Sequence, residues 1–152
     1  DNQIKAGADV VQIFDSWAGL LPDKKIKNFC YEPNAKIVNF CKENKILNIC
    51  FPKGIKEKFK NFNEFVKPNG INIDPDISPS WAKSSLKNIC IQGGMSPDIL
   101  LNDLDYLTNK IDIYLEKFNI KVFGPNKIAS SIFSGMAAQL TATNGSLFLG
   151  EF

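Results

Sequence analysis

The fold is decided by the stretch Val10-Val11-Gln12-Ile13-Phe14-Asp15-Ser16-Trp17-Ala18-Gly19. It begins as a short, mostly apolar run, and such a run bounded by turn residues predicts a buried strand. An acid, a hydroxyl, an indole and a glycine follow at its carboxyl end. Open α/β sheets and α/β barrels bind ligands outside the carboxyl ends of their strands. The end of this strand is therefore the first place to look for a functional site.

The same unit of strand, turn and helix recurs along the chain. Strands are predicted at 9–14, 46–51, 71–74, 88–92 and 120–123, and helices at 25–44, 55–66, 80–86 and 103–118. Strands that alternate with helices through short connections predict a parallel sheet. The predicted fold class is therefore α/β, a partial (β/α)8 barrel of about five βα units. It cannot close on its own, because a complete barrel takes roughly 250 residues.

Composition divides the chain at about residue 124. Residues 1–124 carry the βα pattern, whereas 125–152 form an atypical tail rich in small residues, for which the sequence predicts no definite fold. The chain starts with Asp1 and enters directly into the predicted end of a helix. We therefore expect it to be a piece of a longer protein.

The bulk composition is that of an ordinary globular domain and narrows the functional classes. The 152 residues are 44% hydrophobic with a net charge of +2, which predicts neither a nucleic-acid nor a membrane partner. All 18 basic residues are lysines, and histidine is absent. Enzymes that act on carboxylates usually use arginine, and histidine is the commonest general acid or base. We therefore expect an incomplete catalytic set.

The four cysteines, Cys30, Cys41, Cys50 and Cys90, form no CxxC pair. Zinc sites need closer pairs, usually with histidine. Because free cysteine is usually buried, we expect buried, reduced thiols in a cytoplasmic protein.

Polar or small residues end four of the predicted strands, and a shared sheet edge would bring them together. The candidate site-lining residues are Asp15, Ser16, Trp17, Lys53, Asp74, Gln92 and Gly93. Ser16 either donates a hydrogen bond to a substrate or caps a turn, and without histidine it is no nucleophile. Asp15 and Lys53 either line a site or serve the turn and the solvent. Asp74 and Asp76 are more typical of turn chemistry than of a metal site, so no metal is predicted.

An ordered set of motifs resembles the uroporphyrinogen decarboxylase family. The segments are Ala6-Gly7-Ala8, Phe14-Asp15-Ser16-Trp17-Ala18-Gly19, Phe51-Pro52-Lys53-Gly54, Gly70-Ile71-Asn72-Ile73-Asp74 and Ile91-Gln92-Gly93-Gly94-Met95-Ser96-Pro97. The resemblance covers about residues 6–118. It implies a (β/α)8 barrel that decarboxylates the four acetate side chains of uroporphyrinogen III to give coproporphyrinogen III in haem biosynthesis. It further implies a lyase without metal or organic cofactor, and a cytoplasmic homodimer.

The resemblance also limits what this chain does alone. Ser16 matches a family serine that contacts substrate, which implies substrate binding. The family's key aspartate, arginines and tyrosine lie upstream of the matched part, so we expect no catalytic residue here and no activity from the chain by itself. Two places depart from the family: Gly93-Gly94 replaces Gly-Asn, and Val122-Phe123-Gly124-Pro125-Asn126 replaces a histidine-containing segment.

Two alternatives to a decarboxylase remain open at this point. A related corrinoid-dependent methyltransferase uses the same barrel but needs zinc bound by histidine and cysteines. A diverged or truncated barrel piece would have no catalytic role.

Overall fold

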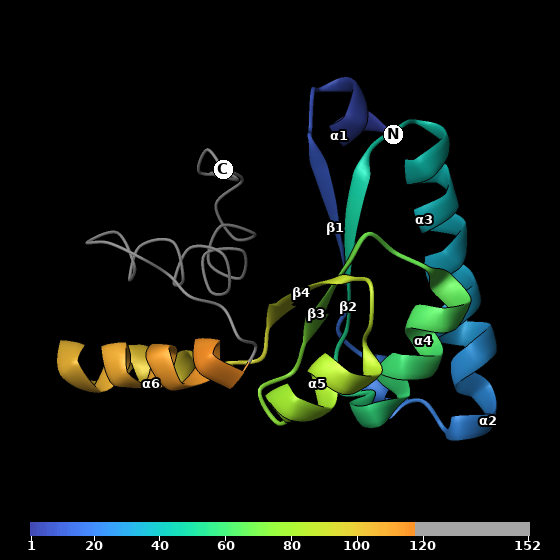
Figure 1. Ribbon diagram of the computed structural model, residues 1–152. Coiled ribbons are helices and arrows are strands. Elements are labelled where there is room, and N and C mark those ends of the chain that lie inside the picture. The colour runs from blue at the N-terminus through green and yellow to red at the C-terminus, as the bar shows by residue number, and fades with distance from the viewer. Residues whose placement is uncertain (118–152) are drawn as a thin grey trace.

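One parallel sheet organises the part of the chain that the computed structural model describes, residues 1–117. The strands β1 (Val10–Asp15), β2 (Leu47–Pro52), β3 (Gly70–Ile73) and β4 (Cys90–Gly93) lie side by side in chain order. Asp15 pairs with Pro52, and Ile73 pairs with Gly93, so the carboxyl ends of all four strands follow one edge (Figure 1). The prediction of an open α/β sheet is confirmed. The fifth predicted strand, 120–123, lies outside the described residues.

Helical segments connect the strands and cover the sheet. In chain order they are α1 (Asn2–Lys5), η1 (Ala18–Leu20), α2 (Asp23–Ile26), η2 (Lys27–Tyr31), α3 (Glu32–Glu43), η3 (Lys56–Lys58), α4 (Phe59–Val66), α5 (Pro79–Ser85), η4 (Pro97–Leu101) and α6 (Leu104–Lys117). Figure 1 shows α3 and α4 on the same side of the strands, whereas α6 extends away from them. None of the helices within residues 1–117 is long and apolar enough to cross a membrane.

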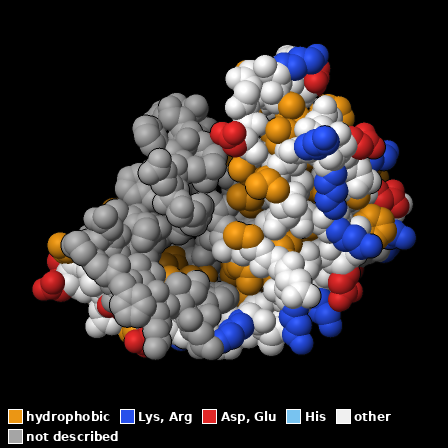
Figure 2. Space-filling model, turned by 45° about the horizontal axis from the view of Figure 1, so that its top comes forward, with side chains coloured by type: hydrophobic (Ala, Val, Ile, Leu, Met, Phe, Trp, Pro, Cys, Tyr) orange, Lys and Arg blue, Asp and Glu red, His pale blue; other side chains and the backbone are white. Residues whose placement is uncertain are grey.

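The hydrophobic core lies between the sheet and helices α2 to α5. Every second strand residue points toward it, because side chains alternate between the two faces of a strand. The strand contribution consists of Ile13, Cys50, Ile71, Ile73 and Ile91, with Ile89 just before β4, and the helices add Ile26, Cys30, Val38, Phe59, Phe62, Val66 and Ala82. In Figure 2, lysines gather over the helical side at the right of the view, and hydrophobic side chains occupy the middle.

The first long helix contains a wide π turn just before Pro33. A proline inside a helix has no N–H, and its ring crowds the carbonyl four residues earlier. The chain relieves this crowding in η2, where the Glu32 N–H donates to the Lys27 carbonyl, a bond across five residues. Pro33 within the predicted helix 25–44 leads us to expect a break or kink; the structure instead forms a π turn that leads directly into α3.

The π turn changes which side chains of this helix are buried. The residue spacing predicts one apolar stripe, but Phe29 is 61%, Ile37 44% and Phe40 39% exposed. The stripe prediction is wrong at these positions because the wider turn shifts the helical phase. The buried positions of α3 are instead Asn34, Val38 and Cys41.

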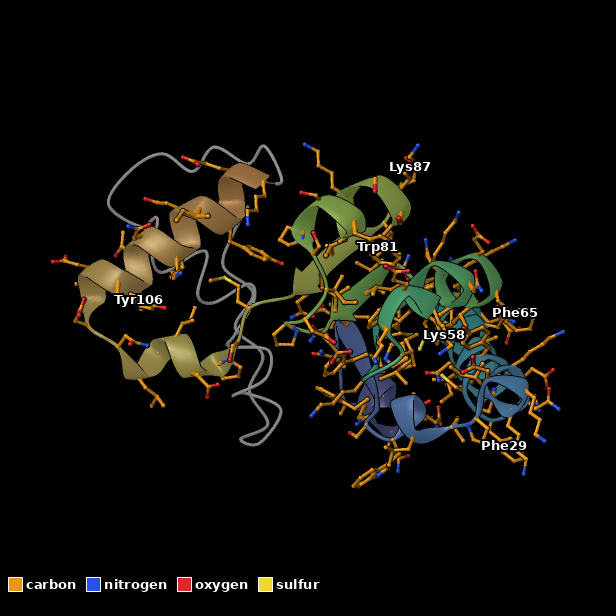
Figure 3. All side chains as sticks on the ribbon, turned by 90° about the horizontal axis from the view of Figure 1, so that it is seen from below. Phe29, Lys58, Phe65, Trp81, Lys87 and Tyr106 are labelled. Carbon is orange, nitrogen blue, oxygen red and sulfur yellow. The ribbon has the colours of Figure 1, made fainter. Side chains whose placement is uncertain are left out.

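Two smaller predictions concern the phenylalanines of α4 and the cysteines. The spacing of Phe59, Phe62 and Phe65 predicts core or interface positions; Phe59 and Phe62 are fully buried, whereas Phe65 is 42% exposed, with its ring centre 6.1 Å from that of Tyr31. Figure 3 places Phe29 and Phe65 on the helical side of the molecule and Tyr106 on α6, apart from them. Cys90 is exposed, whereas the other three thiols are buried as predicted.

Candidate functional site

The turns that follow β1 and β2 are hydrogen-bonded to each other through their main chains. The Lys53 N–H donates to the Asp15 carbonyl at 3.1 Å, and the Gly19 N–H donates to the Lys53 carbonyl at 2.9 Å. Both peptide groups of Lys53 are thereby held by the β1 turn. The two strand ends form one rigid edge.

Glycine is required where these two turns touch. A Cβ atom on Gly19 would lie 2.5 Å from the Gly54 carbonyl oxygen, closer than packed atoms can approach. Gly54 itself has a φ of +78°, a left-handed conformation that side chains disfavour. The small residues of both motifs therefore serve a close backbone approach.

Asp74 ties the third strand to the same edge. It directly follows β3, is 6% exposed, and its Oδ2 accepts the Gly54 N–H at 2.6 Å. Burial raises the pKa of this carboxyl group; the Gly54 hydrogen bond opposes the rise, Asp76 adds to it and Lys53 opposes it. Asp74 thus holds the turn after β2 from the end of the neighbouring strand β3.

The Asp15 carboxylate is directed toward the helices. Its Oδ2 accepts a hydrogen bond at 3.1 Å from the Nδ2 of Asn34, which also donates to the Cys30 carbonyl at 2.8 Å. Burial, followed by the hydrogen bond and the charge of Asp15, raises the pKa of the Cys30 thiol above its usual range. Asp15 is therefore an anchor between β1 and the helical layer, through side chains rather than through turn N–H groups.

Ser16, Trp17 and Lys53 are the predicted site residues that face solvent at this edge. The Trp17 side chain is 75% exposed. A hydroxyl, an indole and an ammonium group are thus available to a ligand, on main chain that is fixed by the turn contacts.

Gln92 and Gly93 lie at the end of β4. Gly93 has a φ of +77°, and its carbonyl accepts the Tyr114 hydroxyl of α6 at 2.8 Å. The Gly94 N–H donates to the Ile73 carbonyl at 2.9 Å, which joins this end to β3. Tyr114 was missed by sequence reasoning because its role depends on how α6 packs.

Two neighbouring amides carry unsatisfied polar atoms on the sheet face opposite the core. Asn72 pairs with Gln92 across β3 and β4. Among the described residues, neither polar atom of the fully buried Asn72 side chain nor the Gln92 Oε1 has a hydrogen-bond partner. Sequence reasoning selected Gln92 but missed Asn72, whose signal was an amide inside an apolar strand.

Metal binding finds no support in the described part of the chain. Residues 1–117 bring together no group of three histidine, cysteine, aspartate or glutamate side chains that could hold an ion. Asp74 is engaged by Gly54, and its neighbour Asp76 is exposed.

The model of the family described as uroporphyrinogen decarboxylase (URO-D) matches residues 1–128. The chain belongs to the uroporphyrinogen decarboxylase family. This family has the TIM-barrel fold, and the open sheet of four parallel strands is consistent with part of such a barrel. The motif regions at the ends of β1 to β4 all lie inside the matched range.

Curated relatives carry the same family name. The chain is 39% identical to the uroporphyrinogen decarboxylase of Rickettsia bellii over 124 residues, 80% of this chain and 36% of the relative. It is 38% identical to that of Orientia tsutsugamushi (strain Boryong) over 103 residues, 66% and 30% of the two chains. For Rhodospirillum rubrum the identity is 34% over 102 residues, 65% and 29% of the two chains. The chain thus spans about a third of the length of these relatives.

Proposed function

We propose that this chain is part of a uroporphyrinogen decarboxylase, a carbon–carbon lyase that acts on uroporphyrinogen III. The reaction removes four acetate carboxyl groups as CO₂ and leaves coproporphyrinogen III, a step of haem biosynthesis. The observation that carries the proposal is the family match over residues 1–128. The fixed strand-end turns in the same range support it, because barrel enzymes bind substrate at this edge.

Residues 1–124 would form the C-terminal half of the barrel, with 125–152 as an atypical tail. The open sheet supports this assignment, since β1 pairs only with β2 among the described residues. A large apolar side chain of the sheet, Leu47 at the start of β2, is also 57% exposed. Further βα units would cover such surfaces.

The role proposed for the chain is substrate binding. Ser16 would donate a hydrogen bond to the tetrapyrrole, with Trp17 and Lys53 beside it. Decarboxylation needs a pyrrole that is protonated on carbon, and a buried carboxylate near the pyrrole N–H groups stabilises the resulting cation. We assign that carboxylate to the upstream half, because Asp15 and Asp74 are both engaged in structural hydrogen bonds. Homodimerisation and a cytoplasmic location belong to the same proposal.

A hybrid enzyme tests this function. The 152-residue chain replaces the matching segment of the Rickettsia bellii enzyme, and coproporphyrinogen is measured after incubation with uroporphyrinogen III. We expect the hybrid to form product and the chain alone to form none. A folded but inactive hybrid, alongside an active parent enzyme, would contradict the proposal. Product from the chain alone would contradict its assignment as a binding half.

A further inference from the structure

We propose that Asp74 is a positioning residue, which accepts the Gly54 N–H and so fixes the turn that presents Lys53 to a substrate carboxylate. The inference rests on the proposed function, because the carboxylate is a side chain of the tetrapyrrole. It adds a role for a residue that touches no substrate itself.

The first step is the rigid placement of the Asp74 carboxylate. Asp74 directly follows β3, and its main-chain carbonyl accepts the Ile77 N–H at 3.1 Å. The side chain is 6% exposed, and its Oδ2 lies 2.6 Å from the Gly54 nitrogen. A hydrogen bond to an ionised acceptor is stronger than one between neutral groups. The Gly54 peptide group is thus held from the neighbouring strand.

The second step leads from Gly54 to Lys53, one residue earlier. The Lys53 N–H and carbonyl are held by Asp15 and Gly19 at 3.1 and 2.9 Å. With the next N–H held by Asp74, main-chain atoms from β1 and a side chain after β3 fix the turn on both sides. Only the exposed Lys53 side chain remains free to move. Its Cα is held in a fixed position, which limits where the ammonium group can lie.

The third step is the chemistry that this placement serves. A lysine ammonium is a compact positive charge that can pair with a carboxylate. The chain contains no arginine, so lysine is the residue type that can offer this charge. Lys53 stands on the same fixed edge as Ser16, the proposed hydrogen-bond donor, because the β1 turn holds its peptide groups. Misplacing a binding group by even about 1 Å can cost up to about a hundredfold in rate.

Kinetics of the active hybrid enzyme test the inference. Asp74→Ala removes the acceptor, and we expect KM for uroporphyrinogen to rise about tenfold with kcat changed by less than about threefold. Asp74→Asn keeps an oxygen that can accept the Gly54 N–H and should restore most of the lost affinity. The exposed neighbour provides the matched control, since Asp76→Ala should leave KM unchanged.

A double-mutant cycle separates positioning from a general structural effect. Lys53→Ala alone should raise KM, and adding Asp74→Ala to it should raise KM little further, because coupled residues are not additive. Fully additive effects would overturn the inference. So would equal KM values for Asp74→Ala and Asp76→Ala, or equal losses in Asp74→Ala and Asp74→Asn.

A second variant covers the case in which Asp74→Ala does not fold. Asp74→Glu keeps the charge but moves the carboxylate by one methylene, and its control is Asp76→Glu. We expect KM to rise for Asp74→Glu as for Asp74→Ala, and to stay unchanged for Asp76→Glu. Equal KM values for Asp74→Glu and Asp76→Glu would overturn the inference. An inactive unsubstituted hybrid would overturn the proposed function as well, which distinguishes the two failures.

Discussion

Single residues at the strand ends serve mainly to build the edge of the sheet. Gly19 and Gly54 allow two turns to touch, Asp74 accepts the Gly54 N–H, and Asp15 accepts from Asn34 on α3. Asp15 and Asp74, two carboxylates that the sequence offers as candidates to line a site, are thus engaged in hydrogen bonds that hold the fold together. The residues left for a ligand are their exposed neighbours.

Replacing Gly19 by alanine should destabilise the chain. The added Cβ would lie 2.5 Å from the Gly54 carbonyl oxygen, a main-chain atom that cannot turn aside. We expect a loss of about 1–3 kcal/mol in the free energy of unfolding, as for other overpacked sites. Urea denaturation of the full chain measures it. The exposed Ser16→Ala serves as control and should change stability by less than about 0.5 kcal/mol.

Asp74 should make stability fall as the pH rises. Its pKa is raised above the ordinary value of 3.8 by burial, against the Gly54 hydrogen bond, with Asp76 adding to the rise and Lys53 opposing it. Between the unfolded and folded pKa values the native state binds more protons, so the free energy of unfolding decreases with increasing pH in that window. Asp74→Asn should remove this component.

Urea denaturation between about pH 3 and about pH 7 checks this prediction. The quantity compared is the slope of the free energy of unfolding against pH, in the unsubstituted chain and in Asp74→Asn. Asp76→Asn is the control for removing one acid from the same loop. A slope in Asp74→Asn that equals that of the unsubstituted chain would show that Asp74 titrates normally.

At the scale of elements, α4 shows how one helix divides its aromatic residues. Phe62 is fully buried in the core, whereas Phe65 is 42% exposed. Phe62→Ala should therefore cost about 3–5 kcal/mol in the free energy of unfolding, because it leaves a cavity. Phe65→Ala on the same helix should cost clearly less. Chemical denaturation measures the free energy of unfolding of both variants. Equal losses of free energy would contradict the different burial of Phe62 and Phe65.

The elements were predictable to different degrees. Apolar runs between turn residues located all four described strands, with bounds within two residues, because buried parallel strands are continuous hydrophobic segments. The face of the first long helix was not predictable, since the π turn before Pro33 shifts its phase. The Asp15–Asn34 contact spans 19 residues and depends on how β1 packs against α3, which local patterns do not encode.

The candidate site was predictable as an edge but not as a set of contacts. The strand-end positions of Asp15, Ser16, Lys53 and Gln92 follow from the parallel βα pattern. That Asp74 holds Gly54, and that Asn72 stands beside Gln92, required the register and the turn geometry.

At the scale of the whole molecule, the four cysteines differ in how deeply they are buried. Cys90 is exposed, and Cys30, Cys41 and Cys50 are buried. Burial raises the pKa of all three, that of Cys50 to about 12, so their reactive thiolate forms are scarce near neutral pH. We expect one thiol to react rapidly with a disulfide reagent and three to react slowly. Denaturation should make all four fast, and fast reaction of the native Cys90→Ser variant would contradict this arrangement.

Main-chain contacts between the β1 and β2 turns set the shape of this sheet edge. The exposed side chains would then decide which ligand the edge binds. The N–H and carbonyl groups of Lys53 are hydrogen-bonded to main-chain atoms of the β1 turn. The Lys53 side chain therefore has no part in building the turn. Replacing Lys53 by glutamine should therefore leave the backbone of the turn in place while removing the positive charge that this edge offers to a ligand.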